Sequence, residues 1–462
     1  MAGGQGRGPM IPFYVVTLSH GEWEDARHCA RHLPAEALPE LRLDLFPDHD
    51  PGDLVDALHR RCLVSCRRRD DGGRWEGTEN DRLARLRAAL QARPAWMDLE
   101  WDGEAERWLQ EPDLREHLPH TRLLRSVHVP GGVFDLPRRL QNLPQGDAFK
   151  WVGRAETLAD NARVKAPLAW ARDHGIALSA FFMGPKGLPS RCLQGAWGGA
   201  FTYAAPDDAS AAAPGQLPLS LLWSWRVHRL HPSFALCGVM GDPVLHSLGP
   251  AFHNERFQRA FKDLLYLPLE AATAEEALEA LNALDLRGVS LTSPLKERLP
   301  ALLGLSGPLN TLWRRDGQEA WHGANTDAEA LEQALEPLPS GAVLILGDGG
   351  VAETSRRVLE RRGRTVLQVS RKKPLSLDAV ADAAPVGVIQ ATRLGMAEGD
   401  AMPFPGPLHA ALPTLRWAVE WIYAETAFAA WARNHGLPLV EGLTLFHAQA
   451  EAQSRLFVEG CG

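Results

Sequence analysis

Eight short apolar runs fill roughly the first two hundred residues, and most of the gaps between them are long enough for a helix. The runs lie at residues 13–18, 40–46, 62–67, 95–101, 122–129, 148–154, 176–184 and 200–205. Two of the intervening segments, 81–92 and 155–175, repeat apolar residues at helical spacing. Eight alternating strand and helix units predict a (β/α)8 TIM barrel over residues 1–228. A doubly wound sheet is the alternative.

The predicted strands carry charged side chains where a purely structural barrel would carry valine, isoleucine or leucine. They are Glu40, Arg42, Arg67, Asp98, Glu100, His128 and Lys150. Residues at the C-terminal ends of barrel strands point into the active site of this architecture. A lysine inside such a strand is costly to bury without a role, whereas a single strand histidine is more often a packing residue. The first half is therefore predicted to be catalytic.

The second half of the chain loses this rhythm after a junction at residues 222–238. We expect a mixed α/β lobe over residues 233–335. Residues 342–363 then follow the order strand, glycine turn, helix, and two further strand-like runs come after them, as in a nucleotide-binding βαβ unit. A Rossmann lobe is predicted over residues 336–440, with C-terminal helices at 440–462 returning to the preceding lobe.

The glycine turn offers backbone amides at a helix N-terminus, which can hold a pyrophosphate. Its residues are Gly347, Asp348, Gly349, Gly350 and Val351. Their spacing falls short of the full dinucleotide fingerprint. The next strand-like run ends in Ser370, Arg371, Lys372 and Lys373. An NAD site usually offers an acidic residue there, whereas cations suit a 2′-phosphate, so the sequence predicts NADP. A structural glycine turn beside a basic loop is the alternative.

Composition excludes several classes of partner. The formal net charge is -8, which argues against a nucleic-acid or anionic-membrane partner. No apolar run is long enough to span a bilayer, and the N-terminus lacks the apolar core of a signal peptide. Six scattered cysteines lack a metal-binding pattern and predict reduced thiols in a cytoplasmic protein.

Six motifs in the second half occur in a characteristic order. They lie at residues 241–254, 288–296, 307–313, 323–331, 390–396 and 441–450. Together, over about 230 residues, they resemble shikimate dehydrogenase. The resemblance implies that Lys296 and Asp327 form the catalytic pair, and that hydride from NADPH reaches a ring ketone whose developing alkoxide needs a proton. Taken alone, Lys296 follows a strand-like run at 288–292 and would be a loop-surface amine.

The same resemblance assigns the remaining site residues. Thr292 and Asn310 would bind ring hydroxyls, Ser247 the carboxylate, and Tyr423 and Gln449 would close the site. Thr392 and Gly442 would join the cofactor site.

Three positions depart from the dehydrogenase pattern. A glycine stands at 249 where a second serine is common, Ser290 replaces an asparagine, and Glu329 and Ala330 stand where a glycine often follows. The missing hydroxyl at Gly249 removes a donor and opens space. We expect weaker shikimate binding or tolerance of the extra hydroxyl of quinate.

The first half carries a second, more eroded set of ordered motifs. They lie at residues 40–44, 65–73, 126–128, 149–151, 183–191 and 212–217. Over about 215 residues they resemble type I 3-dehydroquinate dehydratase, a (β/α)8 enzyme. The resemblance implies that Lys150 forms an imine with the substrate ketone and that His128 is the general acid/base.

The other residues matched by this resemblance are assigned to the substrate. Glu40 and Arg42 would set the ring hydroxyls and the surroundings of the histidine, and Arg67, Arg191 and Gln216 would bind substrate, with arginine suited to a carboxylate. Departures stand at Val129, where aspartate is usual, at Asp71, where glutamate is usual, and at Ala212, where serine is usual. They bear on turnover rate more than on the type of reaction.

Joined in one chain, the two resemblances imply consecutive steps of the shikimate pathway. 3-Dehydroquinate would be dehydrated and the product reduced with NADPH, with small molecules as the only partners and no metal required. Two alternatives stay open: a quinate/shikimate dehydrogenase with an inactive dehydratase domain, and a metabolite-sensing regulator. The sequence leaves oligomeric state and domain orientation undetermined.

Overall fold

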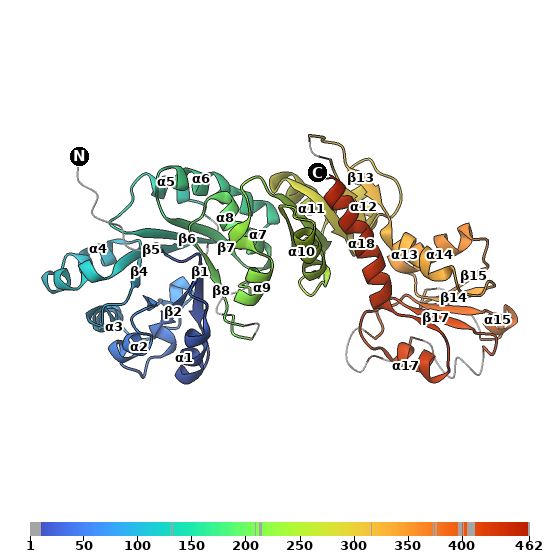
Figure 1. Cartoon of the computed structure of the whole chain (residues 1–462), viewed down its shortest axis with the longest axis horizontal. Helices are drawn as coiled ribbons and strands as arrows, with labels where there is room; N and C mark the ends of the chain where they lie inside the picture. Colours follow the sequence, from blue (N-terminus) through green and yellow to red (C-terminus); the bar gives the residue numbers. More distant parts are fainter. Residues whose placement is uncertain are drawn as a thin grey trace. The chain divides into compact units, whose positions relative to one another are not determined.

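The computed structural model describes residues 11–460, apart from 130, 132, 208, 212–214, 316, 373, 375–376, 396–399, 401 and 404–411. The chain divides into two compact units. The first unit consists mainly of the residues up to Leu236, and the second consists mainly of the residues from Cys237 onward. The eight-stranded sheet lies in the first unit and the C-terminal parallel sheet in the second, and each of these sheets has its own buried core (Figure 1).

The first unit is a nearly closed eight-stranded parallel barrel, so the TIM-barrel prediction is confirmed and the doubly wound alternative is wrong for this half. Its strands are β1 (Tyr14–Leu18), β2 (Ala37–Arg42), β3 (Leu63–Ser65), β4 (Trp96–Glu100), β5 (Arg122–His128), β6 (Ala148–Arg154), β7 (Leu178–Met183) and β8 (Thr202–Ala204). They pair in chain order, and β8 pairs with β1. Between β7 and β8, the Ala200 N–H donates to the Leu178 carbonyl at 2.8 Å.

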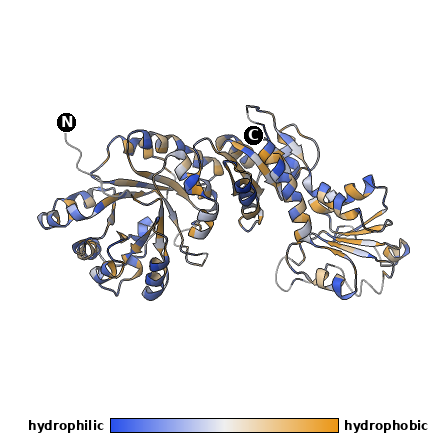
Figure 2. Ribbon diagram, in the orientation of Figure 1, coloured by the Kyte–Doolittle hydropathy of each residue, from blue (hydrophilic) through white to orange (hydrophobic). Residues whose placement is uncertain are grey.

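Helices follow most strands and cover the outside of the barrel (Figure 1). They are α1 (Trp23–His32), α2 (Pro51–Ala57), α3 (Glu79–Gln91), α4 (Gly103–Leu109), α5 (Leu136–Leu140), α6 (Lys165–Asp173), α7 (Leu188–Cys192), α8 (Gln194–Trp197) and α9 (Leu219–Ser224). Helix α3 shows why these segments are helical. The Thr78 hydroxyl caps the N-terminus of α3 by accepting a hydrogen bond from Asp81 N at 3.2 Å, and Leu86 and Leu90 are buried on the inner face of the helix. Figure 2 shows the hydrophobic residues concentrated on the strands.

Two predicted boundaries are wrong. The second strand ends at Arg42, and Leu43–Leu45 form a 3-10 turn, because buried Asp44 leaves the sheet to accept Arg42 and two backbone N–H groups. In the segment 155–175, residues Leu158–Val164 form a 3-10 helix and α6 begins only at Lys165. Proline is accommodated in the first turn of a helix, which is where Pro167 lies.

The second half begins with a five-stranded mixed sheet in the order β10-β9-β11-β12-β13. Its strands are β9 (Ala235–Gly241), β10 (Leu264–Glu270), β11 (Leu286–Leu291), β12 (Thr311–Trp313) and β13 (His322–Ala324). Its helices are α10 (Gly249–Arg259), α11 (Ala274–Ala283), α12 (Leu295–Leu302) and α13 (Thr326–Leu335). Strand β12 pairs antiparallel with both of its neighbours.

A second five-stranded sheet follows, and all its pairings are parallel in the order β15-β14-β16-β17-β18. Its strands are β14 (Val343–Leu346), β15 (Val366–Val369), β16 (Gly387–Gln390), β17 (Trp417–Glu420) and β18 (Leu439–Val440). Its helices are α14 (Gly350–Arg361), α15 (Leu377–Asp382) and α17 (Ala427–Asn434). Strand order reverses at β14, and such a point is where doubly wound sheets bind nucleotides.

The last helix, α18 (Gly442–Gly460), runs from the parallel sheet to the mixed sheet (Figure 1). Its Gln453 side chain donates to the Asn310 carbonyl at 3.3 Å and accepts from the Ser290 hydroxyl at 2.7 Å. Among the described residues, no helix combines the length and apolar character that crossing a membrane requires.

Candidate active sites

A cavity of about 210 Å³ opens among the barrel strands. Its walls are Thr17, Glu40, Arg42, Arg67, Asp71, Gly72, His128, Lys150, Val152, Phe181, Met183, Arg191, Tyr203 and Gln216. All seven dehydratase residues assigned from the sequence line this one cavity. The barrel therefore brings together side chains that lie up to 176 positions apart, from Glu40 to Gln216.

Lys150 on β6 is 2 % exposed and lies between two side chains from other strands. Its Nζ donates to Asp98 Oδ2 at 2.6 Å and lies 3.1 Å from the Tyr203 hydroxyl oxygen. Burial and the neighbouring Arg67 charge lower the pKa of the Lys150 amine, although Asp98 opposes them. A lowered pKa increases the fraction of neutral amine, which is the nucleophilic form.

Arg67 ties the lysine and the histidine to one carboxylate. It donates to Asp98 Oδ2 at 2.6 Å and from Nη1 to His128 Nδ1 at 3.2 Å. Burial and the Arg67 charge hold the pKa of His128 well below 6.5. Because Nδ1 accepts a hydrogen bond from Arg67, the single ring proton of neutral His128 is assigned to Nε2. His128 is thus a neutral base next to the lysine's ion-pair network.

Arg191 on α7 differs from the other arginines of the cavity. Its side chain is 3 % exposed, and its guanidinium has no hydrogen bond or ion pair with any residue that the structure describes. It lies over the Phe181 ring at 4.5 Å, and burial lowers its pKa to about 10. By contrast, Arg42 is neutralised by Asp44 through two hydrogen bonds of 2.8 and 2.5 Å. A buried, unneutralised guanidinium is costly unless an anion binds to it.

The remaining dehydratase candidates have fixed positions around the cavity. Glu40 accepts from Thr17 at 2.7 Å and from Ser65 at 3.0 Å, and Gln216 donates to Thr17 at 3.3 Å. Among the departures, Asp71 accepts from Arg68 at 2.9 Å and lines the cavity. The Val129 N–H donates to Val152, and Ala212 lies outside the described residues.

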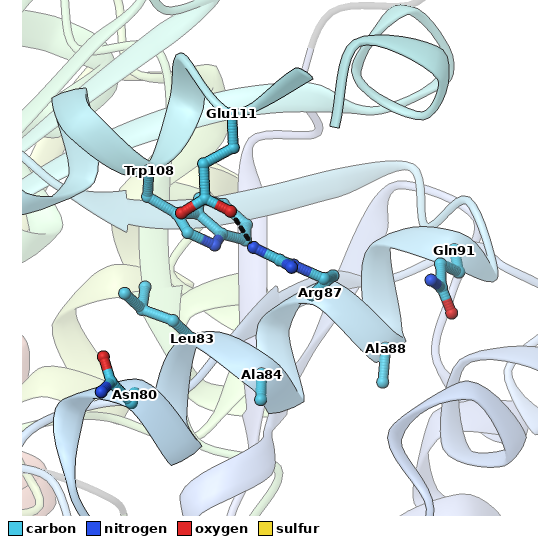
Figure 3. A pocket seen from close by; sticks show the side chains of 8 residues that line it. All are labelled: Asn80, Leu83, Ala84, Arg87, Ala88, Gln91, Trp108 and Glu111. Atoms are coloured by element: carbon cyan, nitrogen blue, oxygen red, sulfur yellow. Dashed lines mark hydrogen bonds and ion pairs between the residues drawn. The ribbon is translucent and has the colours of Figure 1, made fainter. Parts of the chain in front are cut away.

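A second cavity, of about 300 Å³, lies on the outer surface of the barrel between α3 and the region of α4. Figure 3 shows its lining, in which Arg87 from α3 forms an ion pair with Glu111. Arg87 Nη1 also lies 3.2 Å from Asp113 Oδ2, so two carboxylates neutralise the Arg87 charge. This cavity shares no lining residue with the barrel cavity and offers no surplus cation for a carboxylate substrate.

The second half contains another lysine–aspartate pair. Lys296 donates to Asp327 Oδ2 at 2.6 Å, with side-chain exposures of 20 % and 12 %. Lys296 lies in the first turn of α12 rather than at the end of a strand, because the chain leaves β11 and starts a helix at Leu295. Asp327 lies in the first turn of α13, whose N-cap Asn325 accepts from Ala328 N at 3.0 Å.

Asn310, Thr326 and Gln449 form a buried network beside this pair. The Asn310 side chain accepts from Thr326 N at 2.8 Å and donates to the Thr326 hydroxyl at 3.0 Å. The Thr326 hydroxyl also lies 3.3 Å from the Gln449 side-chain oxygen. Both amides are therefore oriented before any substrate binds, as positioning groups must be.

Thr292, Ser247 and Tyr423 are the remaining substrate-binding candidates of the second half. The Thr292 N–H donates to the Met240 carbonyl at 2.9 Å, and the Ser247 hydroxyl accepts from Gly249 N at 3.1 Å. Tyr423 is 50 % exposed as a residue, yet burial and the Asp327 charge raise its pKa.

The glycine turn lies next to Lys296. Gly347 has φ +122°, and a Cβ there would come within 2.6 Å of the Ala391 carbonyl oxygen, so only glycine is accommodated. Gly349 is the N-cap of α14 and faces open space, with Asp348 before it and Gly350 and Val351 after it. A Cβ on Gly350 would lie 3.8 Å from the Lys296 Cδ atom. This turn can hold a phosphate close to the lysine.

The other cofactor candidates are more dispersed. Arg371 and Lys372 are exposed just after β15, where the Ser370 hydroxyl accepts from Lys372 N at 3.1 Å, and Lys373 lies outside the described residues. Thr392 follows β16, and its hydroxyl is fixed by Gln390 at 3.0 Å. A Cβ on Gly442 would meet the Ile422 carbonyl at 2.3 Å, so Gly442 also serves backbone packing.

Sequence reasoning missed several functional partners. Asp98 is the carboxylate common to Arg67 and Lys150, and Tyr203 contacts Lys150 from β8. Asp98 was visible only as one of several charged strand residues. No sequence signal marked Tyr203, because its contact with β6 depends on barrel closure.

Each half of the chain matches a known protein family. The family model described as type I 3-dehydroquinase matches residues 14–224, and the one described as shikimate dehydrogenase substrate binding domain matches residues 239–307. A shikimate dehydrogenase (NADP(+)) of Rubrobacter xylanophilus is 32 % identical over 263 residues, which cover 49 % of this chain and 92 % of that protein. The chain belongs to the family of type I 3-dehydroquinase/shikimate dehydrogenase fusions.

Relatives with both halves share this organisation. A bifunctional 3-dehydroquinate dehydratase/shikimate dehydrogenase, chloroplastic, of Arabidopsis thaliana is 28 % identical over 382 residues, covering 76 % of this chain. The match spans only 62 % of the Arabidopsis protein's own length. The shikimate biosynthesis protein AroDE of Chlamydia muridarum is 26 % identical over 395 residues, covering 81 % of this chain and 80 % of that protein. The barrel cavity thus lies in the part of the chain that matches the type I 3-dehydroquinase model, and Lys296 lies in the part that matches the shikimate dehydrogenase substrate binding domain.

Proposed function

We propose that this chain dehydrates 3-dehydroquinate to 3-dehydroshikimate and then reduces 3-dehydroshikimate to shikimate with NADPH. The observation that carries the proposal is a pair of lysine–aspartate sites, one in each family region, with Nζ–Oδ2 distances of 2.6 Å in both. The substrate of each step is a ring ketone with a carboxylate. A sensor built from degraded enzymes would have no need to keep both amines oriented.

In the barrel, the Lys150 amine attacks the substrate ketone, and loss of water gives an imine. The protonated imine acidifies the neighbouring carbon, and neutral His128 removes the α-proton. The same histidine then returns a proton to the departing hydroxyl, and hydrolysis of the imine releases the product. Arg191 supplies the unneutralised cation for the substrate carboxylate. Glu40, Arg42, Arg67 and Gln216 complete the binding cavity.

In the dehydrogenase site, Lys296 as ammonium donates a proton to the developing alkoxide. Asp327 holds the amine and the substrate hydroxyl, Asn310 and Thr292 bind ring hydroxyls, and Ser247 binds the carboxylate. Tyr423 and Gln449 close the site.

NADP is the cofactor that the glycine turn supports best. The cradle at Gly347, Gly349 and Gly350 leaves room for a pyrophosphate, and Arg371 and Lys372 offer cations to a 2′-phosphate. NADPH bound there supplies the hydride. Lys296, whose Cδ atom lies 3.8 Å from the position of a Cβ on Gly350, borders the same turn.

The proposal includes a domain division and a location. Residues 1–228 form the dehydratase, 233–335 the substrate lobe and 336–440 the NADP lobe, with 440–462 returning to the substrate lobe. The two family matches lie inside the first two ranges. The five cysteines in the described part of the chain are free thiols, in keeping with a reducing compartment such as the cytoplasm.

Two experiments test the two halves separately. Borohydride added with 3-dehydroquinate should leave a reduced adduct on the peptide that contains Lys150, detected by mass spectrometry, and no adduct in Lys150→Met. With 3-dehydroshikimate, kcat/KM should be higher for NADPH than for NADH. Absence of the adduct with intact reductase activity would favour the alternative of a quinate/shikimate dehydrogenase with an inactive barrel. Val129 and Gly249 are the residues that favour this alternative.

A further inference from the structure

The Tyr203 side chain is the least expected neighbour of the reactive amine. It lies on β8, is 6 % exposed, and its hydroxyl oxygen is 3.1 Å from Lys150 Nζ. The lysine Nζ also lies over the tyrosine ring, 4.6 Å from the centroid. Phe181 and Phe201 pack around the ring with centroids 6.0 Å away, so the hydroxyl is held in place.

The groups around Nζ differ in what they can do with a proton. Asp98 is held ionised because the charges of Arg67 and Lys150 lower its pKa, and Arg67 is a permanent cation. His128 receives its Arg67 hydrogen bond on Nδ1. Tyr203 is neutral, since burial and the charges of Glu40 and Asp98 raise its pKa well above 10. A hydroxyl that keeps its own proton can still accept one proton while it donates another.

We propose that the Tyr203 hydroxyl relays a proton between Lys150 Nζ and the substrate oxygen while the carbinolamine forms and breaks down. When the amine adds to the ketone, nitrogen carries an extra proton and oxygen a negative charge. The N–H bond breaks as a new bond forms to the tyrosine oxygen. The original tyrosine O–H breaks as the proton passes to the substrate oxygen. Tyrosine ends unchanged and neutral, and the reverse transfer serves imine hydrolysis.

The geometry favours this step over the later α-proton transfer. In the carbinolamine, nitrogen and oxygen are bonded to the same carbon, so a hydroxyl within 3.1 Å of the nitrogen is also within reach of the oxygen. Asp98 lies 2.6 Å from the same nitrogen but carries no proton to donate. The inference rests on the proposed imine mechanism and assigns its first and last steps to Tyr203.

Tyr203→Phe removes the oxygen and keeps the ring, and Tyr14→Phe is the matched control. Tyr14 is also buried in the barrel, and its hydroxyl lies 2.7 Å from His228 Nδ1, outside the cavity. Single-turnover reactions with 3-dehydroquinate, quenched by borohydride at successive times, measure how fast the Lys150 adduct forms. We expect Y203F to slow adduct formation about 10²-fold. Dehydration of the adduct once formed should keep its rate, and Y14F should change neither phase.

The outcomes separate the relay from the proposed function. If the unchanged chain forms no adduct on Lys150, the imine mechanism itself fails. If Y203F forms the adduct as fast as the unchanged chain, or slows both phases equally, the relay is wrong and the imine mechanism stands. Should Y203F fail to fold, adduct formation by the unchanged chain in D2O decides: a slower phase than in H2O supports the relay, and equal rates overturn it.

Discussion

The two lysine–aspartate pairs of this chain have the same Nζ–Oδ2 distance of 2.6 Å but opposite surroundings. The side chains of Lys150 and Asp98 are 3 % and 1 % exposed, whereas those of Lys296 and Asp327 are 20 % and 12 % exposed. Asp98 also binds Arg67, and no arginine bonds to Asp327 among the described residues. Burial and a competing cation favour the neutral, nucleophilic form of Lys150.

The difference teaches that an ion pair does not define a chemical role by its geometry alone. The barrel surrounds its lysine with strands on all sides. The dehydrogenase places its lysine at the start of a helix beside an open glycine turn. The nucleophilic role proposed for Lys150 and the acid role proposed for Lys296 therefore rest on the different environments that the two folds provide.

The largest effect should come from exchanging each lysine for methionine. Lys150→Met should lower dehydration of 3-dehydroquinate by about 10⁴-fold or more, since the covalent step disappears, and should leave reduction of 3-dehydroshikimate unchanged. Lys296→Met should show the opposite selectivity. Separate activity assays with 3-dehydroquinate and with 3-dehydroshikimate measure these opposite selectivities. Loss of both activities in either variant would contradict two independent sites.

Removing the carboxylates should distinguish the pairs by stability. Asp98→Asn removes the nearest counter-charge of both Arg67 and Lys150 and leaves Glu40, 3.8 Å from Arg67, as the remaining carboxylate, so we expect a loss of about 3–5 kcal/mol in the free energy of unfolding. Asp327→Asn breaks a partly exposed pair and should cost less than about 1 kcal/mol. Denaturant unfolding of both variants provides the comparison. Equal losses would mean that burial does not separate the two sites.

Arg191→Met should improve stability while it harms function. The side chain is buried without a counter-ion in the described residues, so an apolar replacement should raise the free energy of unfolding by about 1 kcal/mol or more. Loss of the carboxylate contact should raise KM for 3-dehydroquinate about 10²-fold. Arg154→Met, on the exposed end of β6, is the control and should change neither. A destabilised R191M with an unchanged KM would refute the assignment.

The pH dependence of dehydration should report the Lys150 environment. Activity needs the neutral amine, and its pKa is lowered, so kcat/KM should rise with pH through a limb below 10.5. Asp98 raises the pKa of Lys150, so Asp98→Asn should move this limb to lower pH. Profiles of kcat/KM against pH measure the shift, with Asp327→Asn as the control. A limb that moves to higher pH in D98N would contradict the proposed electrostatics.

The smallest effect concerns Gly249 in the dehydrogenase. A serine there restores a donor beside Ser247 and narrows the carboxylate end of the site. Gly249→Ser should raise the preference for shikimate over quinate by a factor of roughly 10, about one hydrogen bond's worth of free energy. The ratio of kcat/KM values for the two substrates measures it. An unchanged ratio would show that Gly249 does not set the preference.

The sequence was sufficient for the architecture because an apolar run marks every strand of the barrel and most of the gaps are long enough for a helix. All eight apolar runs contain or overlap a strand of the structure, in order. The exceptions have local causes. Leu43–Leu45 looked like more strand but turns out of the sheet around buried Asp44, and Lys296 looked like a strand terminus but begins a helix.

The site was predictable only where a motif marked it. Lys150 and His128 were found through the resemblance, while Asp98 was one charge among many and Tyr203 was invisible. Their contacts with Lys150 join residues 52 and 53 positions apart. No periodicity encodes such a contact, because it depends on how β4, β6 and β8 approach one another when the barrel closes.

The most direct test of the account uses the whole chain in one cuvette. NADPH absorbance is followed after addition of 3-dehydroquinate, with 3-dehydroshikimate in a parallel cuvette. The account predicts NADPH oxidation in both, since the barrel must supply the ketone that the dehydrogenase reduces. Oxidation with 3-dehydroshikimate alone, or in neither cuvette, would contradict it.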